Sequence, residues 1–292
     1  MQEGKFSRTA QRVAIRRAAH QVLDHPRVLD DPLALRIIGA ETAEELRSNP
    51  KENHKFSRAF RAFMAARSRY AEDELARAVE HGVSQYVILG AGLDTFAYRN
   101  RHPELRVFEV DHPATQEWKR EQLQAASISI PHSVTFVPVN FERQTLAEGL
   151  GGCGFDANAA AFFSWLGVTP YLTHEACMAT LSFIASMPAG SGVVFDFAID
   201  PALLNPGQRE ALDALSARVA RYGEPFQLFF DPAKLQNELK EMGFDRTEFL
   251  QGRELNSRYF EDRKDGLMVR GGLGHLMGAW IEARSFELGK SF

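Results

Sequence analysis

The chain has 292 residues and a net charge of −4, because it contains 34 Lys and Arg residues and 38 Asp and Glu residues. It has no long basic run, so we expect no nucleic-acid partner. Hydrophobic residues make up 45% of it, which is enough for a large core, but no apolar stretch is long enough to cross a bilayer, so we expect no membrane contact. Its two cysteines, Cys153 and Cys177, lack metal-ligand spacing; we therefore expect no metal site and no disulfide framework, and a cytoplasmic protein.

The first 80 residues are predicted to form helices. Residues 8–23 have apolar positions at helical spacing, and His25-Pro26 interrupts the pattern. Asp30-Asp31-Pro32 is typical of a helix start and predicts a second helix through about Ala40. Residues 56–81 predict a third helix, whose buried stripe consists of Phe56, Phe60, Phe63, Met64, Ala71 and Leu75. We expect residues 1–80 to form a helical cap region.

After Gly82 the pattern changes to short apolar runs that alternate with helical stretches. The predicted strands are 86–89, 106–110, 134–137, 160–163, 192–197 and 275–283, and the predicted helices lie near 113–126, 173–187 and 231–242. This alternation favours an α/β fold with a mostly parallel sheet over residues 81–292. Residues 201–225 form a long connection, which predicts a lid-like insertion.

Two features at predicted strand ends suggest a nucleotide-like ligand. Gly90 and Gly92 follow the first strand, where glycines let the backbone approach a ligand. Asp111 ends the second strand, nineteen residues after Gly92, and its two oxygens suit the hydroxyls of a ribose. A tight turn and a helix N-cap would explain the same residues. The third glycine of a dinucleotide fingerprint is missing, which argues against a nicotinamide cofactor.

Motifs along nearly the whole chain resemble the leucine carboxyl methyltransferase-like family, especially its bacterial branch of polyketide-type O-methyltransferases. They are Thr9-Ala10, Val13-Ala14, Arg17-Ala18, Asp31-Pro32-x-Ala34, Ala66-Arg67-Ser68-Arg69-Tyr70, Leu89-Gly90-Ala91-Gly92-Leu93-Asp94-Thr95, Tyr98-Arg99, Phe108-Glu109-Val110-Asp111-x-Pro113 and Lys119-Arg120. The resemblance implies a Rossmann-like class I methyltransferase, with a seven-stranded sheet, helices on both faces and a helical cap, that uses S-adenosylmethionine.

The resemblance also implies roles for single residues. Arg67 matches an arginine that holds the methionine carboxylate, and a guanidinium suits this through its planar fork. Gly90 and Gly92 match the loop under the methionine part, and Asp111 matches the ribose-binding acid. Asn140-Phe141 stands near the adenine, where the family usually has an aspartate and an apolar residue.

Two departures affect the implied site. Leu166-Gly167 replaces the Glu-Gly that relatives carry before a Tyr-Leu pair, which leaves Ser164 or Trp165 to contact the cofactor, although Trp165 could also be core. Gln11 replaces a lysine of the carboxyl-methylating members, which argues against a protein C-terminus as the substrate.

The implied reaction is O-methylation of a hydroxyl or carboxylate on a small molecule. A carboxylate acceptor needs no general base, and for a hydroxyl acceptor the candidates are His112, Tyr171 and His174, none of which we assign. A nicotinamide-dependent oxidoreductase and a cofactor-binding protein without catalysis remain alternatives. We further expect a mobile cap, with an acceptor site lined by apolar residues that include Phe6, Leu203, Leu204 and Tyr222.

Overall fold

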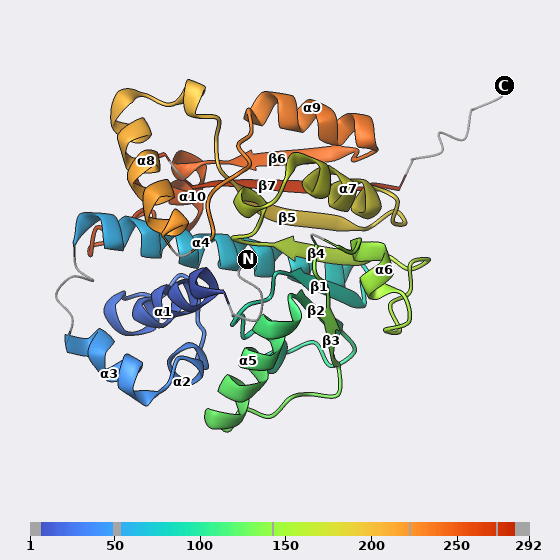
Figure 1. The fold of residues 1–292 in the computed structure, drawn as a ribbon, viewed down its shortest axis with the longest axis horizontal. Coiled ribbons are helices and arrows are strands. Elements are labelled where there is room, and N and C mark those ends of the chain that lie inside the picture. The colour runs from blue at the N-terminus through green and yellow to red at the C-terminus, as the bar shows by residue number, and fades with distance from the viewer. Residues whose placement is uncertain (1–6, 49–53, 142, 222, 273, 284–292) are drawn as a thin grey trace.

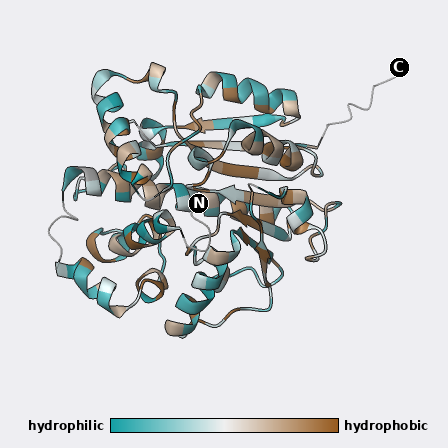
Figure 2. Cartoon of the chain, in the orientation of Figure 1, coloured by the Kyte–Doolittle hydropathy of each residue, from teal (hydrophilic) through white to brown (hydrophobic). Residues whose placement is uncertain are grey.

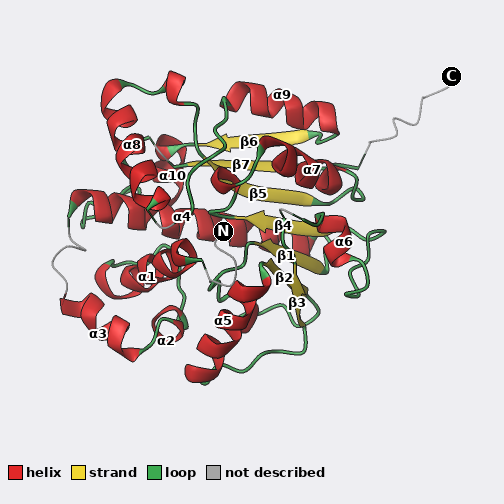
Figure 3. Ribbon diagram, in the orientation of Figure 1, coloured by secondary structure: helices red, strands yellow, loops and turns green. Residues whose placement is uncertain are grey.

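A seven-stranded sheet forms the centre of the computed structural model, which describes residues 7–48, 54–141, 143–221, 223–272 and 274–283, without the side chain of Phe56. The strand order is β3-β2-β1-β4-β5-β7-β6 (Figures 1 and 3). The strands are β1 (Gln85–Leu89), β2 (Arg106–Asp111), β3 (Val134–Pro138), β4 (Ala161–Trp165), β5 (Gly192–Phe197), β6 (Arg246–Leu250) and β7 (His275–Trp280). Strands β1 to β5 pair in parallel and β7 is antiparallel to both neighbours, which confirms the predicted mostly parallel α/β sheet.

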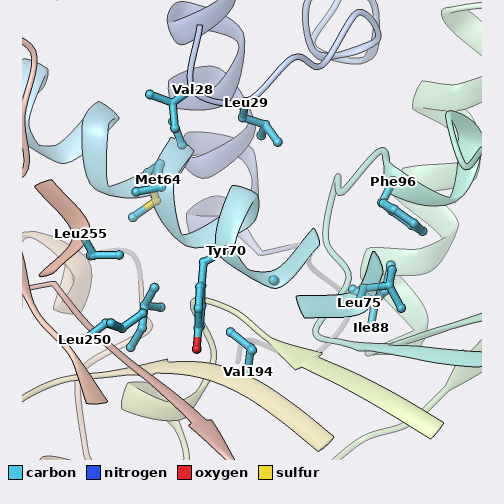
Figure 4. Close-up of a cluster of buried hydrophobic side chains, with 14 of the residues drawn as sticks. Val28, Leu29, Met64, Tyr70, Leu75, Ile88, Phe96, Val194, Leu250 and Leu255 are labelled. Carbon is cyan, nitrogen blue, oxygen red and sulfur yellow. The ribbon is translucent and has the colours of Figure 1, made fainter. Parts of the chain in front are cut away.

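Helices cover both faces of this sheet (Figure 1). One face packs against α4 (Lys55–Glu80) and α10 (Gly252–Tyr259), where Met64, Leu75 and Leu255 belong to one buried cluster with strand residues (Figure 4). On the other face lie α5 (Pro113–Ala125), α6 (Leu146–Leu150), α7 (His174–Ala185) and α9 (Pro232–Met242). Strands β1 and β4 are fully buried and mostly apolar because both faces are covered, as in the brown strands of Figure 2.

The remaining helices gather at the end of the sheet toward which β4 points (Figure 1). They are α1 (Arg8–Leu23), α2 (Ala34–Ile37), α3 (Ala40–Ser48) and α8 (Pro206–Ala220). The predicted bounds of α1 are confirmed. Helix α4, which we predicted as part of the cap, instead packs along the sheet as well as against α1, so it joins the cap to the core.

One prediction about this region is wrong. The second helix does not run to Ala40, because Gly39 adopts a φ of +87° after one turn and a separate helix begins at Ala40. The long connection at residues 201–225, predicted as a lid-like insertion, contains a helix that the sequence analysis did not predict, α8. A capping box between Asn205 and Gln208, with Pro206 at the first helical position, starts this helix.

None of the helices in the described ranges is long and apolar enough to cross a membrane.

Candidate functional site

A cavity of about 450 Å³ opens at the carboxyl ends of strands β1, β2, β3 and β4. Every residue that the sequence analysis proposed for the cofactor lines it: Arg67, Gly90, Gly92, Asp111, Asn140, Phe141 and Ser164. These residues come from α4, from strands β2 and β4 and from the loops after β1 and β3, so only the folded sheet brings them together. Ligands of open α/β sheets bind in this position.

The glycine loop needs its glycines for two different reasons. Gly90 has a φ of +65°, and a Cβ there would lie 2.3 Å from a methyl group of Val168 in the loop after β4. Gly92 has a φ of +45°, and its Cβ would lie 3.0 Å from the Cβ of Ala10 in α1. Both angles are in the left-handed region that glycine adopts without strain. The loop therefore stays thin, and β4 and the cap can approach it closely.

Asp111 organises this loop through its carboxylate. Its Oδ2 accepts a hydrogen bond from the backbone N–H of Gly92 at 2.6 Å, and its Oδ1 accepts one from the N–H of His112 at 2.7 Å. Burial raises the pKa of this carboxyl, and the two N–H donors oppose that shift. Each oxygen retains a second lone pair, so the side chain can still accept hydrogen bonds from the cavity.

Arg67 is a buried ion-pair partner rather than a solvated arginine of a helix face. Its Nη1 lies 2.5 Å from Oδ2 of Asp196, and the other oxygen of Asp196 accepts the backbone N–H of Gly167 at 2.5 Å. The sequence analysis did not single out Asp196. Its signal in the sequence was similar to that of Asp111, namely a carboxylate near the end of a predicted strand.

Asp196 also supplies a carboxylate near the position where relatives have a glutamate and this chain has Leu166. Leu166 lines the cavity and packs against the α4-side core, so no carboxylate stands at that position. The neighbouring strand β5 supplies one instead, through Asp196, and directs it toward Arg67. A Cβ at Gly167 would lie 3.0 Å from Nη2 of Arg67, so glycine is the residue that leaves room for the guanidinium.

Of the two β4 residues predicted to contact the cofactor, Ser164 lines the cavity and Trp165 does not. Ser164 lines the cavity, and its Oγ accepts a hydrogen bond from Tyr86 at 2.7 Å. Trp165 is fully buried among the residues of the opposite face and does not line the cavity, so its alternative interpretation as core is correct.

Motifs distant in sequence meet in one buried polar network that joins the cap to the glycine loop. Arg17 in α1 donates to Asp31 at 2.5 Å, to Asp94 at 2.9 Å and to Thr95 at 2.9 Å. Asp31 also accepts a hydrogen bond from Thr95 at 2.7 Å. Since Asp94 itself lines the cavity, α1 is held directly against the site.

The three candidate bases differ in their position. His112 lines the cavity, but its Nδ1 accepts the N–H of Ala114 at 3.3 Å and so caps α5. Tyr171 also lines the cavity, and burial raises its pKa, which keeps the phenol protonated. His174 is exposed at the start of α7 and does not line this cavity.

Other expected residues lie elsewhere. Gln11 is exposed and does not line the cavity. Leu203 is exposed, and neither it nor Leu204 lines this cavity or the smaller one next to it, so their predicted place in an acceptor site is wrong. Phe6 and Tyr222 lie outside the described residues.

Comparisons with known proteins agree on one family. The sequence profile named leucine carboxyl methyltransferase matches residues 10–185. The chain is 34% identical to the Bacillus subtilis protein named putative S-adenosyl-L-methionine-dependent methyltransferase YktD, over 91% of this chain and 95% of that one. A Saccharopolyspora erythraea protein with the same description is 33% identical over 64% of this chain and 66% of its own length.

Two solved structures share the fold. A putative methyltransferase from Thermobifida fusca superposes with a TM-score of 0.60, at 15% identity and over 97% of both chains. A DUF574 family protein from Streptomyces avermitilis superposes with a TM-score of 0.55, at 14% identity, over 91% of this chain and all of that one. At these identities the likeness shows the fold alone, and it matches the expected class I methyltransferase sheet.

Proposed function

The chain belongs to the leucine carboxyl methyltransferase family, and from that premise we propose that it transfers the methyl group of S-adenosylmethionine to an oxygen atom of a small molecule. Membership makes the chain an S-adenosylmethionine-dependent methyltransferase; the oxygen and the small acceptor are the parts we propose. The observation that most supports cofactor binding here is that the seven residues proposed for the cofactor line a single cavity of about 450 Å³; transfer to an oxygen atom is the reaction that the family resemblance implies.

The residues present fit this cofactor in kind. Asp111 offers two carboxylate oxygens to a ribose, Asn140 offers an amide to an adenine edge, and Phe141 offers an apolar surface beside it. Arg67 offers a guanidinium to the methionine carboxylate. Arg67 is bound to Asp196 through Nη1, so the methionine carboxylate would use its other N–H donors, and Asp196 would fix the orientation of the fork.

The protein then has to orient the acceptor and exclude water. When bound, the sulfonium supplies a methyl carbon: an O–C bond forms, the S–C bond breaks and its electron pair stays on sulfur. A carboxylate acceptor loses no proton, whereas a hydroxyl must give one to a base. We assign that base to Glu224, which lines the cavity and accepts a hydrogen bond from Oγ1 of Thr9.

The cap is proposed to close over this site. Glu224, in the segment after α8, also accepts the N–H of Thr9 at 3.2 Å, so this contact joins the two parts of the cap above the cavity. Hydrogen exchange tests the closure. Amides of residues 8–23 and 206–221 should become protected when S-adenosylhomocysteine and an acceptor bind, and unchanged protection would identify a fixed cover.

The experiment for the main proposal compares cofactors and then follows the methyl group. Calorimetry should show binding of S-adenosylmethionine and S-adenosylhomocysteine but not of NAD; binding of NAD alone would support an oxidoreductase. Labelled S-adenosylmethionine should then give an O-methylated product with a panel of small hydroxyl and carboxyl compounds. Glu224→Gln should lower kcat for the hydroxyl acceptors and spare the carboxylates. Cofactor binding without any methylated product would favour the alternative of a protein without catalysis.

A further inference from the structure

Backbone contacts on both sides hold Glu224 in the wall of the cavity of about 450 Å³. On one side, Gly223 turns the chain after α8 with a φ of +79°, and the N–H of Glu224 bonds back to the carbonyl of Val219 at 3.3 Å. On the other side, the N–H of Gln227 donates to the carbonyl of Pro170, in the loop after β4, at 2.7 Å. The fold therefore fixes where this carboxylate meets the cavity.

A single residue of α1, Thr9, orients the carboxylate of Glu224. The backbone N–H and Oγ1 of Thr9 both donate to Oε2 of Glu224, the N–H at 3.2 Å. In the described ranges no hydrogen bond reaches Oε1, and no ion pair includes Glu224. Helix α1 has a cap of its own, because Oγ of Ser7 accepts the N–H of Ala10 at 3.1 Å. The contact thus holds one carboxylate oxygen and leaves the other available to a donor in the cavity.

A second threonine and glutamate make the same two hydrogen bonds elsewhere in the chain. The N–H and Oγ1 of Thr145 donate to one oxygen of Glu148, at 2.8 and 3.0 Å. These residues are exposed, lie outside the cavity and are three positions apart in the capping box of α6, so the helix turn itself produces their contact. Thr9 and Glu224 are 215 positions apart. Their contact forms only where α1 meets the segment after α8.

Glu224 lies at the end of the cavity where the methyl group is expected. The strand order β3-β2-β1-β4-β5 puts Asp111 and Asn140, which are proposed to hold the adenosine, on the side of β2 and β3. Arg67, which is proposed to hold the methionine carboxylate, pairs with Asp196 of β5, and the segment of Glu224 bonds to the loop after β4. A cofactor in this orientation has its adenosine away from Glu224 and its methionine part, with the methyl group, toward it.

The charge of Glu224 distinguishes between a carboxylate and a hydroxyl acceptor. A carboxylate would bring a second negative charge close to a half-buried carboxylate whose partner, Thr9, supplies only neutral donors. It would also need no base. A hydroxyl instead brings a donor, and its O–H can bond to Oε1 of Glu224. The geometry therefore favours a hydroxyl group as the methyl acceptor.

We propose that the acceptor is an uncharged hydroxyl compound whose O–H donates to Oε1 of Glu224, and that Thr9 is the residue that positions this base. An O–C bond forms as the S–C bond breaks, the electron pair of that bond stays on sulfur, and the hydroxyl proton passes to Oε1. Because Thr9 and Glu224 belong to the two parts of the cap, the contact that closes the cap also orients the base. This inference rests on the proposed methyltransferase function and adds the acceptor class and a positioning residue.

The first test compares compounds that share one body and differ in the reacting group. The pairs are 4-methylphenol with 4-methylbenzoate, benzyl alcohol with benzoate, and 1-octanol with octanoate, each incubated with the protein and labelled S-adenosylmethionine. At least one hydroxyl compound should give its methyl ether ten or more times faster than its partner gives a methyl ester. A smaller difference, or faster formation of the ester, would overturn the inference.

Variants of Thr9 test the positioning role with the best hydroxyl acceptor of the panel. Thr9→Val removes the Oγ1 donor at nearly the same volume and should lower kcat about tenfold, with unchanged affinity for S-adenosylhomocysteine in calorimetry. Thr9→Ser keeps the donor and should keep kcat within about twofold of the wild type. Thr145→Val is the matched control, since it removes the same hydrogen bond away from the cavity, and its kcat should equal that of the wild type.

A double-mutant cycle separates a role in orienting the base from a general effect on α1. In the Glu224→Gln background, Thr9→Val should cause no further loss of kcat, because the base through which Thr9 acts is already absent. Thr9→Ala gives the same comparison if Thr9→Val does not fold.

Three results of the variants would also overturn the inference: wild-type kcat in Thr9→Val, a Thr9→Ser variant as slow as Thr9→Val, or losses that multiply in the double variant. Failure of the proposed function has a different signature, because no compound of the panel would then be methylated at all.

Discussion

Replacement of Asp111 by Asn should weaken cofactor binding without unfolding the protein. The exchange keeps the size of the side chain but removes its charge and replaces one acceptor oxygen with a donor. Each oxygen already accepts one backbone N–H, at 2.6 and 2.7 Å, which leaves one lone pair per oxygen for the two ribose hydroxyls. Losing one charge-assisted hydrogen bond costs about 1.5–3 kcal/mol. Since about 1.4 kcal/mol is a factor of ten, the dissociation constant should rise roughly 10- to 150-fold.

Calorimetry with S-adenosylhomocysteine and with adenosine checks this prediction, because both ligands contain the ribose and should lose affinity by a similar factor. Asp231→Asn is the matched control: Asp231 also accepts two backbone N–H groups, at the start of α9, but it does not line the cavity. Both N–H donors of Asp231 bond to Oδ1, so Asp231→Asn should lose little free energy of unfolding in urea. Asp111→Asn turns an amide N–H₂ toward one backbone N–H and should lose about 1–3 kcal/mol. Adenosine binding that is unchanged in Asp111→Asn would place the ribose elsewhere and refute the reasoning.

Three further predictions concern buried groups. Lys119→Met should lower the free energy of unfolding by about 3–5 kcal/mol in urea, because Glu109 is then buried without the ammonium 2.7 Å away, and burial already raises its pKa. Arg47→Met at an exposed pair should cost about 0–1 kcal/mol, and equal losses in the two variants would contradict this prediction. Gly167→Ala should weaken S-adenosylhomocysteine binding about tenfold by calorimetry, because Gly167 has a φ of +78° and an added Cβ would lie 3.0 Å from the guanidinium of Arg67. Wild-type affinity of this variant would exclude the guanidinium of Arg67 from the site. Burial lowers the pKa of His275 to about 4. Between pH 6.5 and 4 the unfolded chain therefore binds a proton at this imidazole and the folded protein does not, so the free energy of unfolding should fall by up to about 3 kcal/mol over this range. In His275→Phe this part of the pH dependence should vanish, and its persistence would assign it to other groups.

The sequence predicted the core of the fold well where burial is uniform. Strands β1, β4 and β5 are covered on both faces, so most of their residues are apolar, and these short apolar runs are visible without a structure. Strand β6 was missed for the opposite reason. It lies at the edge of the sheet and begins Arg246-Thr247-Glu248, and only its pairing with β7 makes it a strand.

The site was predictable as a set of residues but not as a set of contacts. Glycines and an acid at strand ends identify the cavity, since parallel strands end at one edge of the sheet. The pairing of Arg67 with Asp196 spans 129 positions in sequence and depends on the order of β4 and β5. The order of strands in the sheet cannot be predicted from the residues around either position. The same limit explains Leu203 and Leu204, which are apolar in sequence, while α8 directs Leu212 and Val219 toward the smaller cavity instead.

The place of β7 between β5 and β6 sets an order of events during synthesis. The ribosome delivers β5 well before its partner, because the chain from Ala198 to Gly274 must be made first. During that interval β5, with the sequence Gly-Val-Val-Phe-Asp-Phe, presents an unpaired apolar edge, and β6 has no neighbour at all. Such edges pair readily with other chains. Translation that stalls before His275 should therefore yield a nascent chain that aggregates or recruits chaperones, rather than a smaller folded protein.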